Sequence, residues 1–355
     1  MFRIPLALAV LALAACSPDF DPASRVEKLR LLAVRADPPE IEPPSATAAA
    51  PDRAALTALV LRGDLSARPA TVLYVACLPG PDSSPTPCTT LATLRDPAAL
   101  AVEATRAACP GAAVAPVVFA GAEVCSAGAC GPARATLDGT VVDFPPPALA
   151  LPPGYGFGGL PRGSPERALG TFAPVLAFAV DAAPDELAGA APGGCPAARL
   201  GAGLARLWGE REHVLAEKRV HVRGPEAPDA PNRNPAVAGI AASGAALGEA
   251  PPSPLGAGRW ALRPLLPPDA GALHDLETTL DASGAPVGRA PEEWVYSWFS
   301  TAGEIDVLHT REPEPDEWRL AAGDVAGGGR ALVAVVVRDL RGGTAWVTRE
   351  VALRP

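Results

Sequence analysis

Residues 331–339 read ALVAVVVRD, a run of apolar and β-branched side chains that ends in an acidic residue. The segment LRGG follows at 340–343, and AWVTREVALR then alternates polar and apolar residues over 345–354. β-Branched residues favour strands, and glycine supplies the positive φ angles that a tight turn requires. The stretch therefore predicts a hairpin between a buried strand and a partly exposed strand.

Four features occur in the same order in two parts of the chain: an opening strand, a strand with an aromatic residue, an apolar run that ends in aspartate, and an alternating closing strand. They lie at 29–41, 71–78, 172–181 and 218–223 in the first part, and at 235–243, 294–300, 331–339 and 345–354 in the second. This repetition predicts two related domains in tandem. We place them at 29–224 and 235–355. The segment 225–234 contains three prolines and both asparagines of the chain, which predicts an exposed linker.

The second part resembles the immunoglobulin-like and PKD-like β-sandwiches of bacterial surface proteins. The residues VYSW at 295–298 resemble their central aromatic strand, and VVVRD at 335–339 followed by RGG at 341–343 resembles their last hairpin. The segment STAG at 300–303 departs from the acidic, glycine-rich turn of PKD repeats. The resemblance implies a mainly β protein with two immunoglobulin-like β-sandwich domains, and such widespread folds say little about function.

The first domain is longer because of an insertion before its apolar run. Asp96 followed by Pro97 predicts the start of a short helix that continues to Ala108, since proline is favoured at the first helical position. A second helix is expected over 197–208. We therefore expect an insertion of loops and short helices, tied by disulfides.

The first 15 residues combine an early arginine with a short apolar run, which is typical of a secretory signal peptide and too short for a transmembrane helix. The segment Leu13, Ala14, Ala15 and Cys16 resembles the lipobox of bacterial lipoproteins. The resemblance implies cleavage before Cys16, a diacylglyceryl group on its thiol and an acyl chain such as palmitate on its amino group. Residues 16–28 would then be the lipidated cysteine and its tether. Ser17, in place of aspartate, favours the outer membrane of the cell envelope.

The chain has seven cysteines. If Cys16 carries lipid, six are left in an exported protein, and an even number indicates disulfides. We predict the pairs Cys77–Cys88, Cys125–Cys130 and Cys109–Cys195, which is one of 15 possible pairings. Zinc is not expected, because the chain has no CxxC pair and no histidine before residue 213.

The segment 154–159, GYGFGG, matches the glycine pattern GxGxxG of dinucleotide-binding proteins, and Asp181 ends a predicted strand further on. However, prolines at 152, 153, 161 and 165 fall where that motif needs a strand and a helix. We interpret the segment as a flexible surface loop.

No hydrolase motif is present, and the four histidines, His213, His221, His274 and His309, do not accompany one. The carboxylates Glu292, Glu293, Glu312, Glu314 and Asp316 lie among prolines, which predicts solvated loops. We therefore expect no catalytic residues, no metal and no cofactor. The net charge of −9, with acids and bases interspersed, also argues against nucleic acid as a partner.

The leading hypothesis is a non-enzymatic, lipid-anchored envelope protein that binds a protein or glycan partner or acts as a structural spacer. One alternative is an enzyme or transport accessory protein with its site in the insertion at 80–170. A further alternative is a pair of domains stiffened by calcium.

Overall fold

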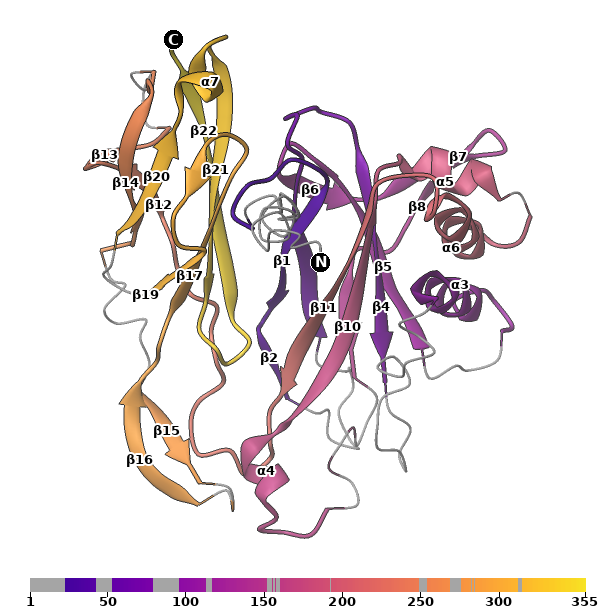
Figure 1. The fold of residues 1–355 in the computed structure, drawn as a ribbon. Helices are drawn as coiled ribbons and strands as arrows, with labels where there is room; N and C mark the ends of the chain where they lie inside the picture. The colour runs from indigo at the N-terminus through magenta and orange to yellow at the C-terminus, as the bar shows by residue number, and fades with distance from the viewer. Residues whose placement is uncertain are drawn as a thin grey trace, which may run out of the picture.

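The computed structural model describes residues 23–42, 53–78, 96–112, 117–151, 155, 157, 160–191, 193–248, 254–268, 276–281, 283, 285–311 and 315–355. Figure 1 shows a mainly β protein in which two β-sandwiches lie side by side, with helices along the outer face of the first. The fold class predicted from the sequence is confirmed.

The first domain contains two main sheets. The smaller has the order β1 (Arg30–Asp37), β3 (Arg53–Leu61), β9 (Ala148–Ala150). The larger has the order β2 (Glu40–Ile41), β11 (His213–Val222), β10 (Thr171–Val180), β4 (Ala70–Cys77), β5 (Val117–Ser126), β6 (Ala129–Pro132). Only the pairing of β2 with β11 is parallel among these described strands.

The second domain also contains two main sheets and a separate ribbon. One sheet has the order β13 (Ala245–Ala246), β12 (Gly239–Ala242), β14 (Gly258–Leu265), β20 (Asp316–Leu320), β18 (Glu304–Ile305). The other has the order β19 (His309–Arg311), β17 (Val295–Ser300), β21 (Gly329–Arg338), β22 (Thr344–Leu353). The ribbon pairs β15 (Leu276–Leu280) with β16 (Pro286–Pro291).

The two domains share one topology. The order β1, β3, β9 in the first corresponds to β12, β14, β20 in the second, and β11, β10, β4 corresponds to β22, β21, β17. In immunoglobulin-like sandwiches, strands A, B and E form one sheet and strands C, F and G form the other. The strands occur in this arrangement here in both domains. The four repeated sequence features fall on equivalent strands, as expected for tandem domains.

Helices cover the outer face of the larger first-domain sheet (Figure 1). They are α3 (Pro97–Ala107), α5 (Pro184–Ala190) and α6 (Pro196–Leu207). Asp96 caps α3 by accepting a hydrogen bond from the amide of Ala99 at 3.2 Å. The two predicted helices are confirmed to within one residue, whereas α5 lies outside the prediction because its short sequence shows little helical periodicity.

Further short elements complete the fold. They are α4 (Pro165–Leu169), the hairpin of β7 (Arg134–Leu137) and β8 (Thr140–Asp143), and α7 (Ala322–Val325). The position of α4 matters for the site described below, since its last carbonyl contacts β11.

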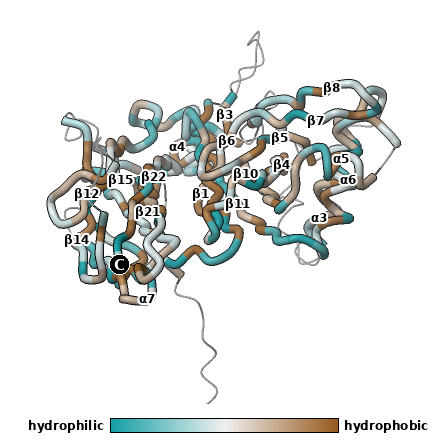
Figure 2. Tube along the Cα trace, turned by 90° about the horizontal axis from the view of Figure 1, so that it is seen from above, coloured by the Kyte–Doolittle hydropathy of each residue, from teal (hydrophilic) through white to brown (hydrophobic). Residues whose placement is uncertain are grey.

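The strand β21 is buried on both faces, which explains its uninterrupted apolar sequence. Val333, Val335 and Val337 point into the core of the second domain. The alternate residues Leu332, Ala334 and Val336 belong to a separate apolar cluster shared with the first domain. We call this cluster the interdomain core; its buried members are Val26, Leu32, Ala33, Leu59, Leu61, Phe299, Leu332, Ala334 and Val336. Figure 2, seen from above, shows β21 and β22 next to β1 and β11 at this contact.

The predicted linker is not exposed throughout. Asn232 is buried, and its backbone amide donates to Glu40 at 2.6 Å while its Nδ2 donates to Asp339 at 2.9 Å. Asn234 donates to the carbonyl of Ala36 at 2.9 Å and accepts from the amide of Thr344 at 2.8 Å. The expectation of an exposed segment was wrong at these positions because the asparagine amides bond polar groups of both domains.

The turn between β21 and β22 occupies residues 339–343. Asp339 accepts from the amides of Arg341 and Gly343, both at 2.8 Å. Positive φ occurs at Leu340 (63°) and Gly342 (107°) rather than at both glycines as predicted. Gly343 is required for another reason, because a Cβ there would lie 1.9 Å from Oδ2 of Asp339.

Candidate functional site

Two cavities of about 350 Å³ each lie between the domains, and residues of the 339–343 turn line both. The first, which we call the interdomain groove, is lined by Glu40, Ala168, Leu169, Phe172, His221, Arg223, Ala227, Pro228, Asp229, Ala230, Glu277, Thr278, Thr279, Leu280, Leu340 and Arg341. Its walls therefore come from both domains, from the linker and from β15. A cavity of this size at a domain junction is a common location for a ligand site.

The lining of the groove includes a buried carboxylate, Glu40, that is paired with a partly buried histidine, His221. The Nδ1 atom of His221 lies 2.7 Å from Oε1 of Glu40, and its Nε2 atom lies 3.0 Å from the carbonyl of Leu169. A carboxylate and a carbonyl can only accept hydrogen bonds, so the ring satisfies both partners when each nitrogen carries a proton. His221 thereby joins β11 to β2 on one side and to α4 on the other.

Glu40 is buried, yet its surroundings favour the charged carboxylate. Burial alone would raise the pKa of Glu40, but hydrogen bonds from His221 and Asn232, with the charges of His221 and Arg341, outweigh it and lower the pKa. The side chain is a fixed carboxylate, and its role in the structure is to hold the domain junction.

The other charged side chains of the groove are also paired. Arg341 contacts Glu277 at 3.4 Å. Asp229 accepts from the amide and hydroxyl of Thr278 at 2.6 and 2.7 Å. Arg223 contacts Glu42 at 2.9 Å. The groove therefore offers polar groups of both signs without a strong net charge.

The rim of the groove is apolar and exposed. Leu169, Phe172 and Leu340 are 43%, 51% and 67% exposed. The ring of Phe172 leans on the imidazole of His221, with centroids 5.3 Å apart and a tilt of 47°. Exposed large apolar side chains next to a cavity are a mark of a binding surface.

The second cavity is built around Lys218 on β11. Its Nζ donates to Oγ1 of Thr344 at 3.1 Å and to the carbonyl of Gly342. Burial lowers the pKa of Lys218 to about 8, against the opposing charge of Asp339. Both partners are in the second domain, so this side chain fastens the first domain to the β21–β22 turn.

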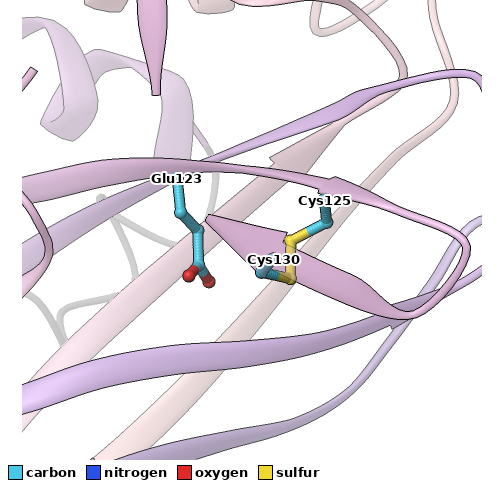
Figure 3. Close-up of side chains that lie close together, drawn as sticks. All are labelled: Glu123, Cys125 and Cys130. Carbon is cyan, nitrogen blue, oxygen red and sulfur yellow. A yellow bond between two sulfur atoms is a disulfide. The ribbon is translucent and has the colours of Figure 1, made fainter. Parts of the chain in front are cut away.

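A buried group in the first domain contains Glu123, Cys125 and Cys130, whose ligand atoms lie within 4.8 Å of one another (Figure 3). The two cysteines form a disulfide, so neither offers the thiolate that a metal would need. Glu123 accepts from the hydroxyl of Tyr74 and from the amide of Ala58 at 2.7 Å. The group braces β5 against β4 and β3, and burial raises the pKa of Glu123 to about 7.

The disulfides Cys109–Cys195 and Cys125–Cys130 are present as predicted. Cys77 is also disulfide-bonded, while its expected partner Cys88 lies outside the described residues. The Cys109–Cys195 bond joins the end of α3 to the start of α6. The signal and lipobox residues 13–16 also lie outside the described part of the chain.

The glycines at 154, 156, 158 and 159 lie outside the described residues, but Tyr155 and Phe157 between them do not. Both aromatic side chains are buried in the first-domain core, and the hydroxyl of Tyr155 donates to the carbonyl of Phe172 at 3.3 Å. The interpretation as a flexible surface loop was wrong at these two residues, because their rings fill the sandwich. Asp181 pairs with Arg62 at 2.7 Å and Arg68 at 3.2 Å.

Two carboxylates that were expected in solvated loops are buried. Glu292 accepts from the indole of Trp294 at 3.1 Å, and burial raises its pKa to about 7. Asp316 begins β20 and accepts from the amides of Val307 and Glu317, and burial raises its pKa as well. The prediction was wrong because it relied on the nearby prolines, which indicate loops, whereas Glu292 and Asp316 lie at buried positions in or next to strands. Glu312 and Glu314 lie outside the described residues, and Glu293 pairs with Arg311.

The remaining histidines have separate positions. His213 lies exposed beside the indole of Trp208, and the Nδ1 atom of His309 is 2.9 Å from the hydroxyl of Ser297. His274 lies outside the described residues. The pairing of His221 with Glu40 could not be predicted from the sequence, because the two residues are 181 positions apart. The local sequence feature that could have pointed to the groove is Phe172, an aromatic residue at the start of an apolar strand.

The strand order and the shared core define the protein as a tandem pair of immunoglobulin-like β-sandwiches. No family model matches the chain, and no curated protein matches its sequence. Among solved structures, the two tandem V-type regions of a v-region-containing chitin binding protein align over 92% of this chain and 100% of that chain, with 8% identity and a TM-score of 0.24. A TM-score this low supports no argument, so the fold assignment stands on the strand order.

Proposed function

We propose that the protein is a non-enzymatic, lipid-anchored component of the bacterial cell envelope, held at the outer membrane by Cys16, and that its rigid pair of domains binds a surface partner. The observation that carries the proposal is where the chain joins the fold. Ser24, eight positions after Cys16, is buried and donates to the carbonyl of Ile305 at 3.2 Å. A tether of that length reaches about 28 Å when fully extended.

The tether is shorter than the sequence suggested. Residues 16–28 were expected to form the lipidated cysteine and its tether, and within them Val26 is fully buried and its amide donates to the carbonyl of Ser300 at 2.8 Å. Arg25 also forms a bridge with Ser300 and contacts Asp324 of α7 at 3.7 Å. Residues 24–26 therefore contact the second domain, and a short tether would keep both domains close to the proposed anchor.

The interdomain groove lies at the far end of the domains from this contact. Glu40 follows the end of β1, and the eight residues of that strand cover about 23 Å. In Figure 1, α7 lies at the top of the second domain, whereas α4 and the β15–β16 ribbon lie at the bottom. A protein tethered near Ser24 would direct the groove away from the membrane, where a partner can reach it.

Among the described residues, no helix is long and apolar enough to cross a membrane. The anchor proposal therefore rests on the lipobox and the short tether. In the described part of the 80–170 insertion, α3, the Glu123 group and the β7–β8 hairpin all pack against the first-domain sheets. We do not propose an enzymatic site there.

We expect Cys16→Ala to move the protein from the membrane fraction to the soluble fraction, because the thiol that carries the lipid is lost. Ser17→Ala is the matched control and stays in the membrane fraction. Mass spectrometry of the amino-terminal peptide will find an acylated Cys16 in the wild-type protein. An unmodified Cys16 in a chain that still resists alkaline washing of the membranes would contradict the proposal.

A further inference from the structure

We propose that the interdomain groove binds a neutral saccharide, with one sugar ring lying against Phe172. This inference rests on the proposed binding function and names its class of ligand. Saccharides present two kinds of surface, an apolar face of C–H groups and an edge of hydroxyls that both donate and accept hydrogen bonds. The groove offers a matching surface for each.

The apolar match is the exposed rim. Phe172 is half exposed although it lies on a strand whose other described residues beyond Thr171 are buried. The ring of Phe172 packs against the imidazole of His221, with the ring centroids 5.3 Å apart. Aromatic faces carry partial negative charge and attract the positive edge of C–H groups. Leu169 and Leu340 add further exposed apolar surface to the lining of the groove.

The polar match comes from β15 and from the turn between β21 and β22. Glu277 supplies acceptors, Arg341 supplies donors, and the hydroxyl of Thr279 supplies both. Glu277 and Arg341 already lie 3.4 Å apart and hold each other in place. A sugar hydroxyl can therefore contact each of them without further ordering of either side chain.

The charge balance selects against ionic ligands. The carboxylates Glu40, Asp229 and Glu277 line the groove together with the guanidinium groups of Arg223 and Arg341. These opposite charges cancel at short range, so the groove gives no steering to a polyanion or a polycation.

The groove is also poorly suited to an extended peptide. A peptide that added to the free side of β15 would need the backbone amides on that side. The amide of Thr278 points there and already donates to Asp229 at 2.6 Å, and the Thr278 hydroxyl donates to the same carboxylate. Asp229 thus closes the middle of the strand to main-chain pairing.

The test is affinity gel electrophoresis of the detergent-solubilised full chain in gels that contain hydroxyethyl cellulose, mannan or dextran as neutral probes and polygalacturonic acid as the anionic probe. We expect retardation by at least one neutral polymer. Phe172→Ala should weaken that binding by at least about tenfold, since it removes the apolar platform. Leu340→Asp should weaken it as well. Val307→Ala, which changes an exposed valine outside the groove, should leave it unchanged.

Both groove substitutions are at exposed positions, so the variants are expected to keep the wild-type circular dichroism spectrum. Absence of retardation by every neutral polymer, retardation by the anionic polymer alone, or unchanged binding by both variants would each overturn the inference. So would a peptide, selected from a phage library on the wild-type chain, whose binding is lost in Phe172→Ala. The anchor proposal is scored separately by the fractionation of Cys16→Ala, so the two proposals fail independently.

Discussion

Replacing Val336 with aspartate is expected to lower the free energy of unfolding by more than about 4 kcal/mol. Val336 is completely buried in the interdomain core, where Phe299 and Leu332 of its own domain meet Leu59 and Leu61 of the first. A carboxylate at this position would be removed from water and surrounded by apolar side chains. The change would therefore separate the domains or unfold them.

Urea denaturation followed by tryptophan fluorescence measures this effect. Val307→Asp is the matched control, because Val307 is 51% exposed and should change stability by less than about 0.5 kcal/mol. If Val336→Asp does not fold, Val336→Ala should fold and cost about 1 to 3 kcal/mol through the cavity that it leaves. A cost below about 1 kcal/mol for the aspartate variant would contradict the shared core.

Replacing Glu123 with glutamine is expected to make the protein more stable at neutral and higher pH. Burial raises the pKa of Glu123 to about 7 from an ordinary value of 4.5. Between these values the folded protein holds a proton that the unfolded chain releases, so raising the pH lowers the free energy of unfolding. The loss amounts to about 3 kcal/mol across this range. Glutamine keeps an oxygen for Tyr74 and Ala58 but carries no charge.

The free energy of unfolding, measured at pH 4.5, 6 and 8, tests this expectation. The wild-type protein should lose about 3 kcal/mol more stability over this range than Glu123→Gln. Glu292 titrates in both proteins and cancels in the comparison. Glu210→Gln, at an exposed position, is the control and should follow the wild type. Equal pH dependence in wild type and Glu123→Gln would show that Glu123 stays charged in the fold.

Much of the fold could be predicted because its strands carry strong local patterns. Three strands, β10, β21 and β17, are continuous apolar or aromatic segments. Their own composition is enough to predict that they are buried strands. Their order along the chain was enough to identify the repeat. The residue after each apolar run, Asp181 or Asp339, also has a shared role, since each accepts hydrogen bonds at the end of its strand.

The candidate site could not be predicted in the same way. The groove exists because the two domains pack on each other. The sequence of β21 predicts a buried strand, but it does not indicate that the second face of the strand contacts another domain. Glu40, His221 and Arg341 come from three distant segments, and each alone is an ordinary polar residue. The prediction of an exposed linker was wrong at Asn232 for a related reason. Prolines indicate that a segment does not pair in a sheet, but they do not exclude burial by tertiary contacts such as those of Asn232.

The two sandwiches share a core and form one rigid unit, and their junction is the proposed binding surface. Differential scanning calorimetry of the full chain carrying Cys16→Ala measures whether they unfold together. A shared core and the Asn232, Lys218 and Arg338 contacts across the junction predict one transition, with equal calorimetric and van't Hoff enthalpies. Two separate transitions, one for each sandwich, would show that the domains fold independently and that the interdomain core does not couple them.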